Sequence, residues 1–267
     1  MIVCKELNKS FENKEDLFKA LRENKKTLIA QKKAVTKYAD AVSFAVPIQN
    51  EKGEAMKYES IDISDVNTLK ASLVINTTNL LDSHSDVHIK GIWNKSVKEQ
   101  RNLLLLKEHV SKFENIISDE VKASVKEFSF KDLGFEFEGK TQALIFDASI
   151  EKDTHEYMFK QYAKGKVKEH SVGMRYVKLE LALNSESKYD IEEKAVWDKY
   201  ISDIANKEVA EEQGYFWAVT EAKVIEGSAV VKGSNFATPT LNIEAVKEDT
   251  STIIEPSNDT QRRKSIL

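Results

Sequence analysis

Runs of apolar residues, some continuous and some alternating with polar ones, predict strands in the middle and later parts of the chain. These runs occupy Ser72–Leu81, Asn102–Val110, Val121–Phe130, Thr141–Ile150, Val167–Leu183 and Tyr215–Val231. Shorter strands are predicted at Met1–Leu7 and at Ala41–Ile48, where Pro47 marks the end. The pattern therefore indicates a fold with a large share of β-structure.

Helical periodicity marks three segments between these strands. Asn13 can cap a helix over residues 14–34. The apolar stripe of that helix consists of Leu17, Leu21 and Leu28. The segment Lys152–Gly165 predicts a helix that ends at its glycine, and residues 186–213 predict one long charged helix that stops at Gly214. We expect an α+β fold, with a curved mixed or antiparallel sheet or a small barrel surrounded by helices.

These elements suggest three parts of the chain. Residues 1–50 form an N-terminal strand–helix–strand appendage. Residues 51–245 form the main domain, which carries the helix 186–213 as an insertion. Residues 246–267 are polar, lack aromatic side chains and contain the sequence QRRK, so we expect them to be a disordered tail.

Composition excludes several classes of protein. Among 267 residues there are 9 glycines and 3 prolines, which argues against collagen-like and glycine- or proline-rich low-complexity chains. The net charge of -4 gives no overall attraction to nucleic acid, and a single cysteine, Cys4, excludes an internal disulfide or a cysteine zinc cluster. No apolar stretch is long enough for a membrane span or a signal core, so we expect a soluble intracellular protein.

His109 stands at the end of the apolar run Asn102–Val110. Alternation along a strand places Leu103, Leu105, Lys107 and His109 on one face. A histidine at the end of a buried strand can act as a general base, because its ordinary pKa lies near neutral pH. The other interpretation is a core histidine whose hydrogen bonds are satisfied.

Ser171 lies within the predicted strand Val167–Leu183. Alternation places Glu169, Ser171, Gly173 and Arg175 on one face and His170, Val172, Met174 and Tyr176 on the other. His170 is therefore badly placed to serve as the base for Ser171. Gly173 leaves space for a substrate backbone on the serine's face, and Arg175 can stabilise developing negative charge there. The alternative is an ordinary edge strand that carries a surface serine.

Glu226 interrupts an apolar row in the predicted strand Tyr215–Val231. Its face also carries Phe216, Ala218, Ala222 and Val224. A carboxylate in such a row needs a partner, and orienting a histidine would give it one. Gly227 can introduce a bulge that shifts the register, so Glu221 on the opposite face stays as a second candidate.

A competing site lies in LLDSHSDVHIKG. In an extended chain its four potential ligands, Asp82, His84, Asp86 and His88, face the same side. Two histidines and two carboxylates are reasonable ligands for zinc or another divalent ion. This segment leaves open a metal-dependent hydrolase, with a polar loop as the simpler interpretation.

Four segments, taken in order, resemble the prohead maturation proteases of tailed phages, which are distantly similar in fold to herpesvirus assemblin. The segments are NTTNLLDSHSDVHIKGIWNKSV, a strand ending in KEHV, HSVGMRYV, and TEAKVIEGSAVVKGSNFATPT. They match the family's Asp-rich loop, base histidine, Ser-x-Gly strand and Glu-x-Ser-x-Val strand. The resemblance spans about residues 70–242 and leaves the first 41 residues unmatched.

The resemblance implies a serine endopeptidase with a herpesvirus-protease-like fold. Ser171 would be the nucleophile, His109 the general base and Glu226 the third member. The family's chemistry needs no cofactor and no metal. The implied substrates are the major capsid protein, the scaffold protein and the protease itself, cut inside the assembling procapsid in the bacterial cytoplasm. A homo-oligomer is expected, with no nucleic acid or membrane partner. A non-enzymatic scaffold or assembly protein is the remaining alternative.

Overall fold

The computed structural model describes residues 1–36, 60–99 and 101–246. The predicted strand Ala41–Ile48 lies outside these ranges, as does the predicted tail except for its first residue. The described part is an α+β structure with three separate sheets, as expected for the fold class, and among the described residues they do not close into a barrel. Within the same ranges, no helix has the length and apolar character needed to cross a membrane.

One sheet has four strands that are antiparallel throughout. Its order is β11 (Thr240–Val246), β3 (Thr68–Thr77), β8 (Lys140–Glu151) and β7 (Glu120–Ser129). The strands β8 and β7 follow the predicted ones closely, whereas β3 begins and ends four residues before the predicted Ser72–Leu81. The first, β11, has no counterpart among the predicted strands, because only isolated apolar residues alternate with polar ones there.

The second sheet is built on the long strand β10 (Tyr215–Val230). The strand β9 (Glu169–Leu183) pairs with it in antiparallel fashion along almost its whole length. Two short strands, β4 (Asp86–His88) and β5 (Leu105–Lys107), pair with β10 in parallel. The strand β6 (Ile116–Ser118) pairs with β5 in antiparallel fashion and forms the edge of the sheet. The predicted strand Asn102–Val110 is therefore wrong in extent, since only its centre is extended and paired.

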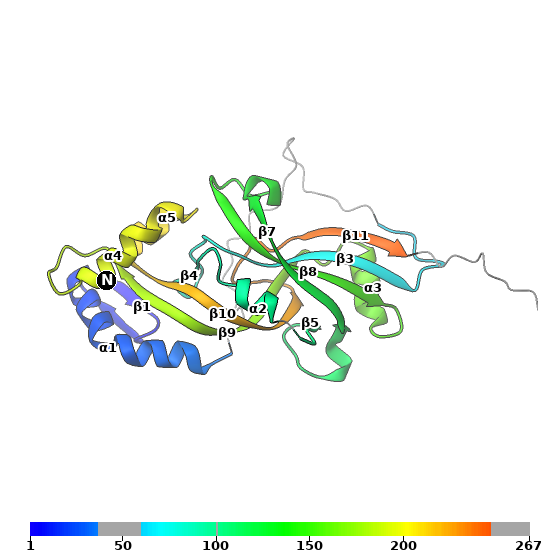
Figure 1. The fold of residues 1–267 in the computed structure, drawn as a ribbon, viewed down its shortest axis with the longest axis horizontal. Helices are drawn as coiled ribbons and strands as arrows, with labels where there is room; N and C mark the ends of the chain where they lie inside the picture. The colour runs from blue at the N-terminus through cyan, green and yellow to red at the C-terminus, as the bar shows by residue number, and fades with distance from the viewer. Residues whose placement is uncertain (37–59, 100, 247–267) are drawn as a thin grey trace, which may run out of the picture.

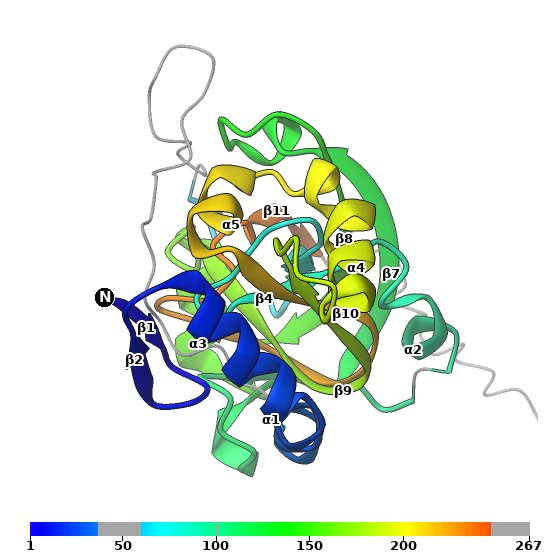
Figure 2. The same ribbon diagram turned by 90° about the vertical axis from the view of Figure 1, so that its left-hand side faces the viewer.

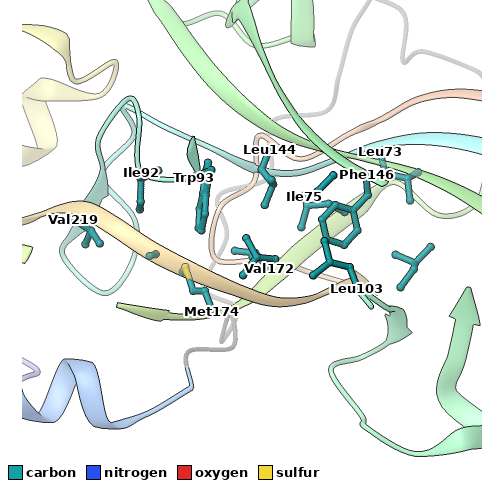
Figure 3. Close-up of a cluster of buried hydrophobic side chains, with 14 of the residues drawn as sticks. Leu73, Ile75, Ile92, Trp93, Leu103, Leu144, Phe146, Val172, Met174 and Val219 are labelled. Atoms are coloured by element: carbon teal, nitrogen blue, oxygen red, sulfur yellow. The ribbon is translucent and has the colours of Figure 1, made fainter. Parts of the chain in front are cut away.

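The main core lies between the two sheets. Figure 3 shows Val172 and Met174 of β9 facing Ile75 of β3 and Leu144 and Phe146 of β8. All five side chains are buried. Burial of each large apolar side chain contributes roughly 1.5–3 kcal/mol, so this layer fixes the face that β9 turns inward.

The N-terminal segment packs against the second sheet. A hairpin of β1 (Ile2–Cys4) and β2 (Lys9–Phe11) precedes the helix α1 (Lys14–Ala34). Asn13 caps this helix by accepting a hydrogen bond from the backbone of Asp16, as predicted. Figures 1 and 2 show α1 gathered with two later helices at one end of the molecule, around the ends of β9 and β10.

The predicted single helix 186–213 is wrong. The segment folds as α4 (Ile191–Tyr200), a short 3₁₀ turn and α5 (Lys207–Gln213), which ends at a left-handed Gly214. The break accompanies a contact with a distant part of the chain, because the Asn206 side chain hydrogen-bonds both backbone groups of Leu81. The helix α3 (Glu156–Ala163) forms inside the predicted range Lys152–Gly165.

Candidate active site

The pairing of β9 with β10 decides which polar side chains meet. Ser171 lies directly opposite Ser228, and Gly173 lies opposite Glu226. Directly paired residues turn their side chains to the same face, so these four positions share one face. Val172 and Met174 lie on the other face of β9, as the alternation predicted, and this face packs into the core. A register shift between Val224 and Glu226 introduces an irregularity just before the carboxylate.

His109 reaches this face through a turn and not through strand alternation. The strand β5 ends at Lys107, and Glu108 and His109 then take left-handed backbone angles, with φ of 53° and 57°. The expected continuation of the Leu105–Lys107 face to His109 is therefore wrong. Two consecutive non-glycine residues in this region cost of order 1 kcal/mol or more each, so surrounding contacts must hold them.

Several hydrogen bonds hold this turn against β10. The Glu108 backbone N–H donates to the Ala229 carbonyl at 3.0 Å, and the Val231 N–H donates to the Glu108 carboxylate at 3.1 Å. The Val110 N–H closes the turn on the Lys107 carbonyl at 3.2 Å. The turn therefore presents the imidazole to the strand that carries Glu226.

The imidazole and the carboxylate meet at short range. The distance between His109 Nδ1 and Glu226 Oε1 is 2.6 Å. Only 10% of the His109 side chain and 5% of the Glu226 side chain are exposed. A hydrogen bond between an imidazole and a carboxylate is strong in such a site, because water competes little for either group.

Gly173 makes room for this pair. A Cβ atom at this position would lie 2.0 Å from Glu226 Oε1, far inside contact distance. The expectation that Gly173 leaves space for a substrate backbone is therefore wrong, since the Glu226 carboxylate occupies that space. The glycine is needed because the carboxylate crosses the backbone of the paired strand on its way to His109.

Ser171 is close to this pair in the sheet but is not hydrogen-bonded to it. The residue is buried, and its hydroxyl forms no hydrogen bond to any residue that the structure describes. Its neighbour His170 points to the opposite face, where it contacts the Tyr162 hydroxyl at 3.1 Å and the Thr238 carbonyl at 3.2 Å. Burial lowers the pKa of His170 to about 4, so this imidazole is neutral and structural at pH 7.

The other polar residues predicted near the site are engaged elsewhere. Glu221 lies 3.2 Å from Lys95 Nζ and 2.7 Å from Lys178 Nζ, and hydrogen bonds from these lysines lower its pKa. The Arg175 side chain is exposed and donates to the Thr36 hydroxyl at 3.3 Å. Of the two candidate glutamates, Glu226 is therefore the one that contacts His109.

The proposed metal ligands do not converge as their alternation suggested. Asp82 Oδ1 accepts the backbone N–H groups of His84 and Asp86 in a turn. Asp86 lies 2.5 Å from Lys32 Nζ, and the ring of His88 lies between Asn76 and Tyr176. The described residues contain no group of three or more His, Cys, Asp or Glu side chains that could hold a metal ion.

Ser228 is a site residue that the sequence did not single out. Its hydroxyl lies 2.7 Å from Glu226 Oε2 and 3.1 Å from the His109 backbone nitrogen. The signal was present in the spacing, because Ser228 follows Glu226 by two residues and so shares its face of the strand.

Comparison with known proteins gives no match to a family model, to a curated protein or to a solved structure.

Proposed function

We propose that the chain is a serine endopeptidase in which Ser171 is the nucleophile, His109 the general base and Glu226 the residue that orients the imidazole. The observation that carries this proposal is the 2.6 Å contact between His109 Nδ1 and Glu226 Oε1, next to the strand that bears Ser171. A buried carboxylate behind an imidazole is the arrangement that nucleophilic serine catalysis requires.

The chemistry divides into acylation and hydrolysis. His109 Nε2 takes the proton of the Ser171 hydroxyl as its oxygen attacks a peptide carbonyl, and the imidazolium then returns this proton to the departing amine. Water attacks the resulting ester in the second half, again with His109 as base. Glu226 stabilises the imidazolium in both halves. Catalytic hydrogen bonds are often long before substrate binds. The proposal is therefore compatible with a Ser171 hydroxyl that makes no hydrogen bond to His109 in the described residues.

The resemblance in the sequence supplies the biological setting of the proposal. The motif order resembles that of tailed-phage prohead proteases, so the substrates we propose are the major capsid protein, the scaffold protein and the enzyme's own chain. The fold would then be a version of the herpesvirus protease fold. Cleavage would take place inside the assembling procapsid, in the cytoplasm of a bacterial host.

The test is co-expression of the protein with its capsid protein, as wild type and as Ser171→Ala. We expect capsid and self-processing fragments only with the wild type, read by mass spectrometry of the cleaved ends. Glu226→Gln is expected to reduce processing roughly 10³- to 10⁴-fold, because the imidazole loses the anion that orients it. Glu221→Gln is the matched control and should process normally, since Glu221 binds surface lysines.

Persistent processing by Ser171→Ala would contradict the assignment of the nucleophile. No processing by any form, together with normal assembly of capsids by Ser171→Ala, would instead favour the non-enzymatic scaffold or assembly protein. Equal activity of wild type and Glu226→Gln would remove the role assigned to the His109–Glu226 contact.

A further inference from the structure

Ser228 occupies the point where the carboxylate and the imidazole turn meet. It lies two residues beyond Glu226 on β10 and is fully buried, opposite Ser171 in the paired strand. Its hydroxyl donates to Glu226 Oε2 at 2.7 Å and accepts the backbone N–H of His109 at 3.1 Å. One side chain therefore contacts both partners of the short His109–Glu226 hydrogen bond.

We propose that Ser228 is a positioning residue of this site, which fixes the Glu226 carboxylate and the His109 turn together and thereby sets the tautomer of the imidazole. The role of Ser228 in catalysis rests on the proposed function, whereas its effect on the tautomer of His109 does not.

The direction of the two hydrogen bonds follows from the number of protons. A serine hydroxyl has one proton to donate, and a backbone N–H can only donate. The Ser228 hydroxyl therefore accepts from His109 and gives its proton to Glu226 Oε2.

The Glu226 carboxylate fixes the position of the imidazole proton. Because Oε1 can only accept, the contact at 2.6 Å requires the proton on His109 Nδ1. Nε2 is then the nitrogen that takes a proton from the nucleophile. Without Ser228, the Glu226 Oε2 atom would be a buried oxygen with one hydrogen-bond partner fewer, and the carboxylate would be held less firmly against His109.

The second hydrogen bond holds the backbone that carries the imidazole. His109 has a left-handed φ of 57°, a conformation that needs support from its surroundings. In this conformation its N–H points at the Ser228 hydroxyl. Loss of the hydroxyl would leave a nearly buried N–H without this acceptor and would loosen the turn next to Glu226.

The experiment compares two pairs of variants in the full chain labelled with ¹⁵N-histidine. Ser228→Thr keeps the hydroxyl, and Ser228→Val has nearly the shape of threonine without it. Ser228→Ala tests the loss without added volume. The control is Ser118→Ala, which removes another buried serine hydroxyl, one that donates to the Ser149 carbonyl of β8 and not to the His109–Glu226 pair.

Ring ¹⁵N chemical shifts at neutral pH report the tautomer of His109, and thermal melts check that each variant folds. We expect the Nδ1–H tautomer in wild type, Ser228→Thr and Ser118→Ala, and a mixture of tautomers in Ser228→Ala and Ser228→Val. If the threonine and valine variants do not fold, comparison of the His109 tautomer in Ser228→Ala and Ser118→Ala still tests the proposal. An unchanged tautomer in a folded Ser228→Ala would overturn the proposal.

A second readout uses a fluorescent fluorophosphonate, which reacts with activated serines. We expect Ser228→Ala to slow labelling of Ser171 roughly 10- to 100-fold, the range seen when a partner behind a metal-bound imidazole is removed. A purely structural role would lower the labelled amount without slowing labelling of the folded fraction and without changing the tautomer of His109. Absence of labelling in wild type, with a tautomer that depends on Ser228, would reject the protease and keep the positioning role.

Discussion

At the scale of single residues, Gly173 sets how closely β9 can approach Glu226. We expect Gly173→Ala to displace the carboxylate from His109, because the new methyl group would lie 2.0 Å from Glu226 Oε1. Loss of the oriented base should reduce the rate of fluorophosphonate labelling by about 10²-fold or more. The measurement is the labelling rate of folded protein, checked by its melting temperature.

A matched control separates this effect from general crowding of the sheet. Gly227→Ala adds a methyl group to the neighbouring strand, where it would meet Phe146 at 2.6 Å in the core and not the carboxylate. We expect this variant to lose stability through overpacking, by about 1–3 kcal/mol, while its folded fraction keeps most of its labelling rate. Equal labelling rates of Gly173→Ala and wild type would show that Glu226 can shift without cost.

At the scale of elements, the helix α1 is joined to the second sheet by a buried ion pair. Lys32 Nζ lies 2.5 Å from Asp86 Oδ1, with 8% of the lysine side chain and none of the aspartate side chain exposed. Burial opposes the charge on Lys32, but Asp86 and Glu6 outweigh it and raise the pKa of Lys32. Removal of the cation would take away the positive charge beside the buried Asp86 Oδ1, while the Tyr176 hydroxyl would still donate to Oδ2.

We therefore expect Lys32→Met to reduce the free energy of unfolding by about 3–5 kcal/mol, measured by urea denaturation. The double variant Lys32→Met/Asp86→Asn should recover part of that loss, because the fully buried residue 86 then carries no charge. Lys160→Met is the control, since its ion pair with Glu156 is exposed and should contribute less than about 1 kcal/mol. A loss of stability as small as that of the control would mean that α1 is not held by Asp86.

Elements were predictable where periodicity was long and uninterrupted. The cap at Asn13 and the strands β8 and β9 follow from patterns of ten or more residues. The break between α4 and α5 was not predictable, because it depends on Asn206 reaching the backbone of Leu81, which is 125 positions away in sequence. The prediction of the face on which His109 lies was also wrong. Glu108 and His109 take left-handed backbone angles that end the alternation, at a point where the local sequence carries no glycine to indicate a turn.

The contact between His109 and Glu226 joins two residues that the sequence had selected, whereas the geometry around them could not be predicted. His109 and Glu226 could be selected because each is a polar exception in an apolar run, and their contact confirms neither reaction nor substrate. Ser228 was overlooked although its spacing from Glu226 places both on one face of the strand, whereas the role of Gly173 depends on the register between β9 and β10, which a single sequence does not specify.

At the scale of the whole molecule, His170 connects three parts of the chain. Its ring contacts Tyr162 of α3 and the Thr238 carbonyl before β11, while its backbone belongs to β9. Desolvation lowers its pKa from 6.5 to about 4 in the folded protein. Between these two pKa values, the imidazole of His170 is protonated in the unfolded chain and neutral in the folded protein.

The sign of the effect follows from this difference. Stability from His170 is fully present above pH 6.5 and is lost as the pH falls toward about 4. We expect the free energy of unfolding to fall by up to about 3 kcal/mol over this range through this one residue. Urea unfolding at a series of pH values measures the loss, and His170→Gln should flatten it, because glutamine cannot take up the proton.

The control for this titration is His155→Gln, which removes a partly buried histidine at the start of α3. Burial and the charge of Lys107 lower the pKa of His155 as well, so its removal should also reduce the acid dependence, but by less than the removal of the fully buried His170. Identical pH profiles for wild type and His170→Gln would show that His170 does not resist protonation. In that case the connection between α3, β9 and β11 would have to tolerate a charged imidazole, which is incompatible with a Tyr162 hydroxyl that donates to its ring.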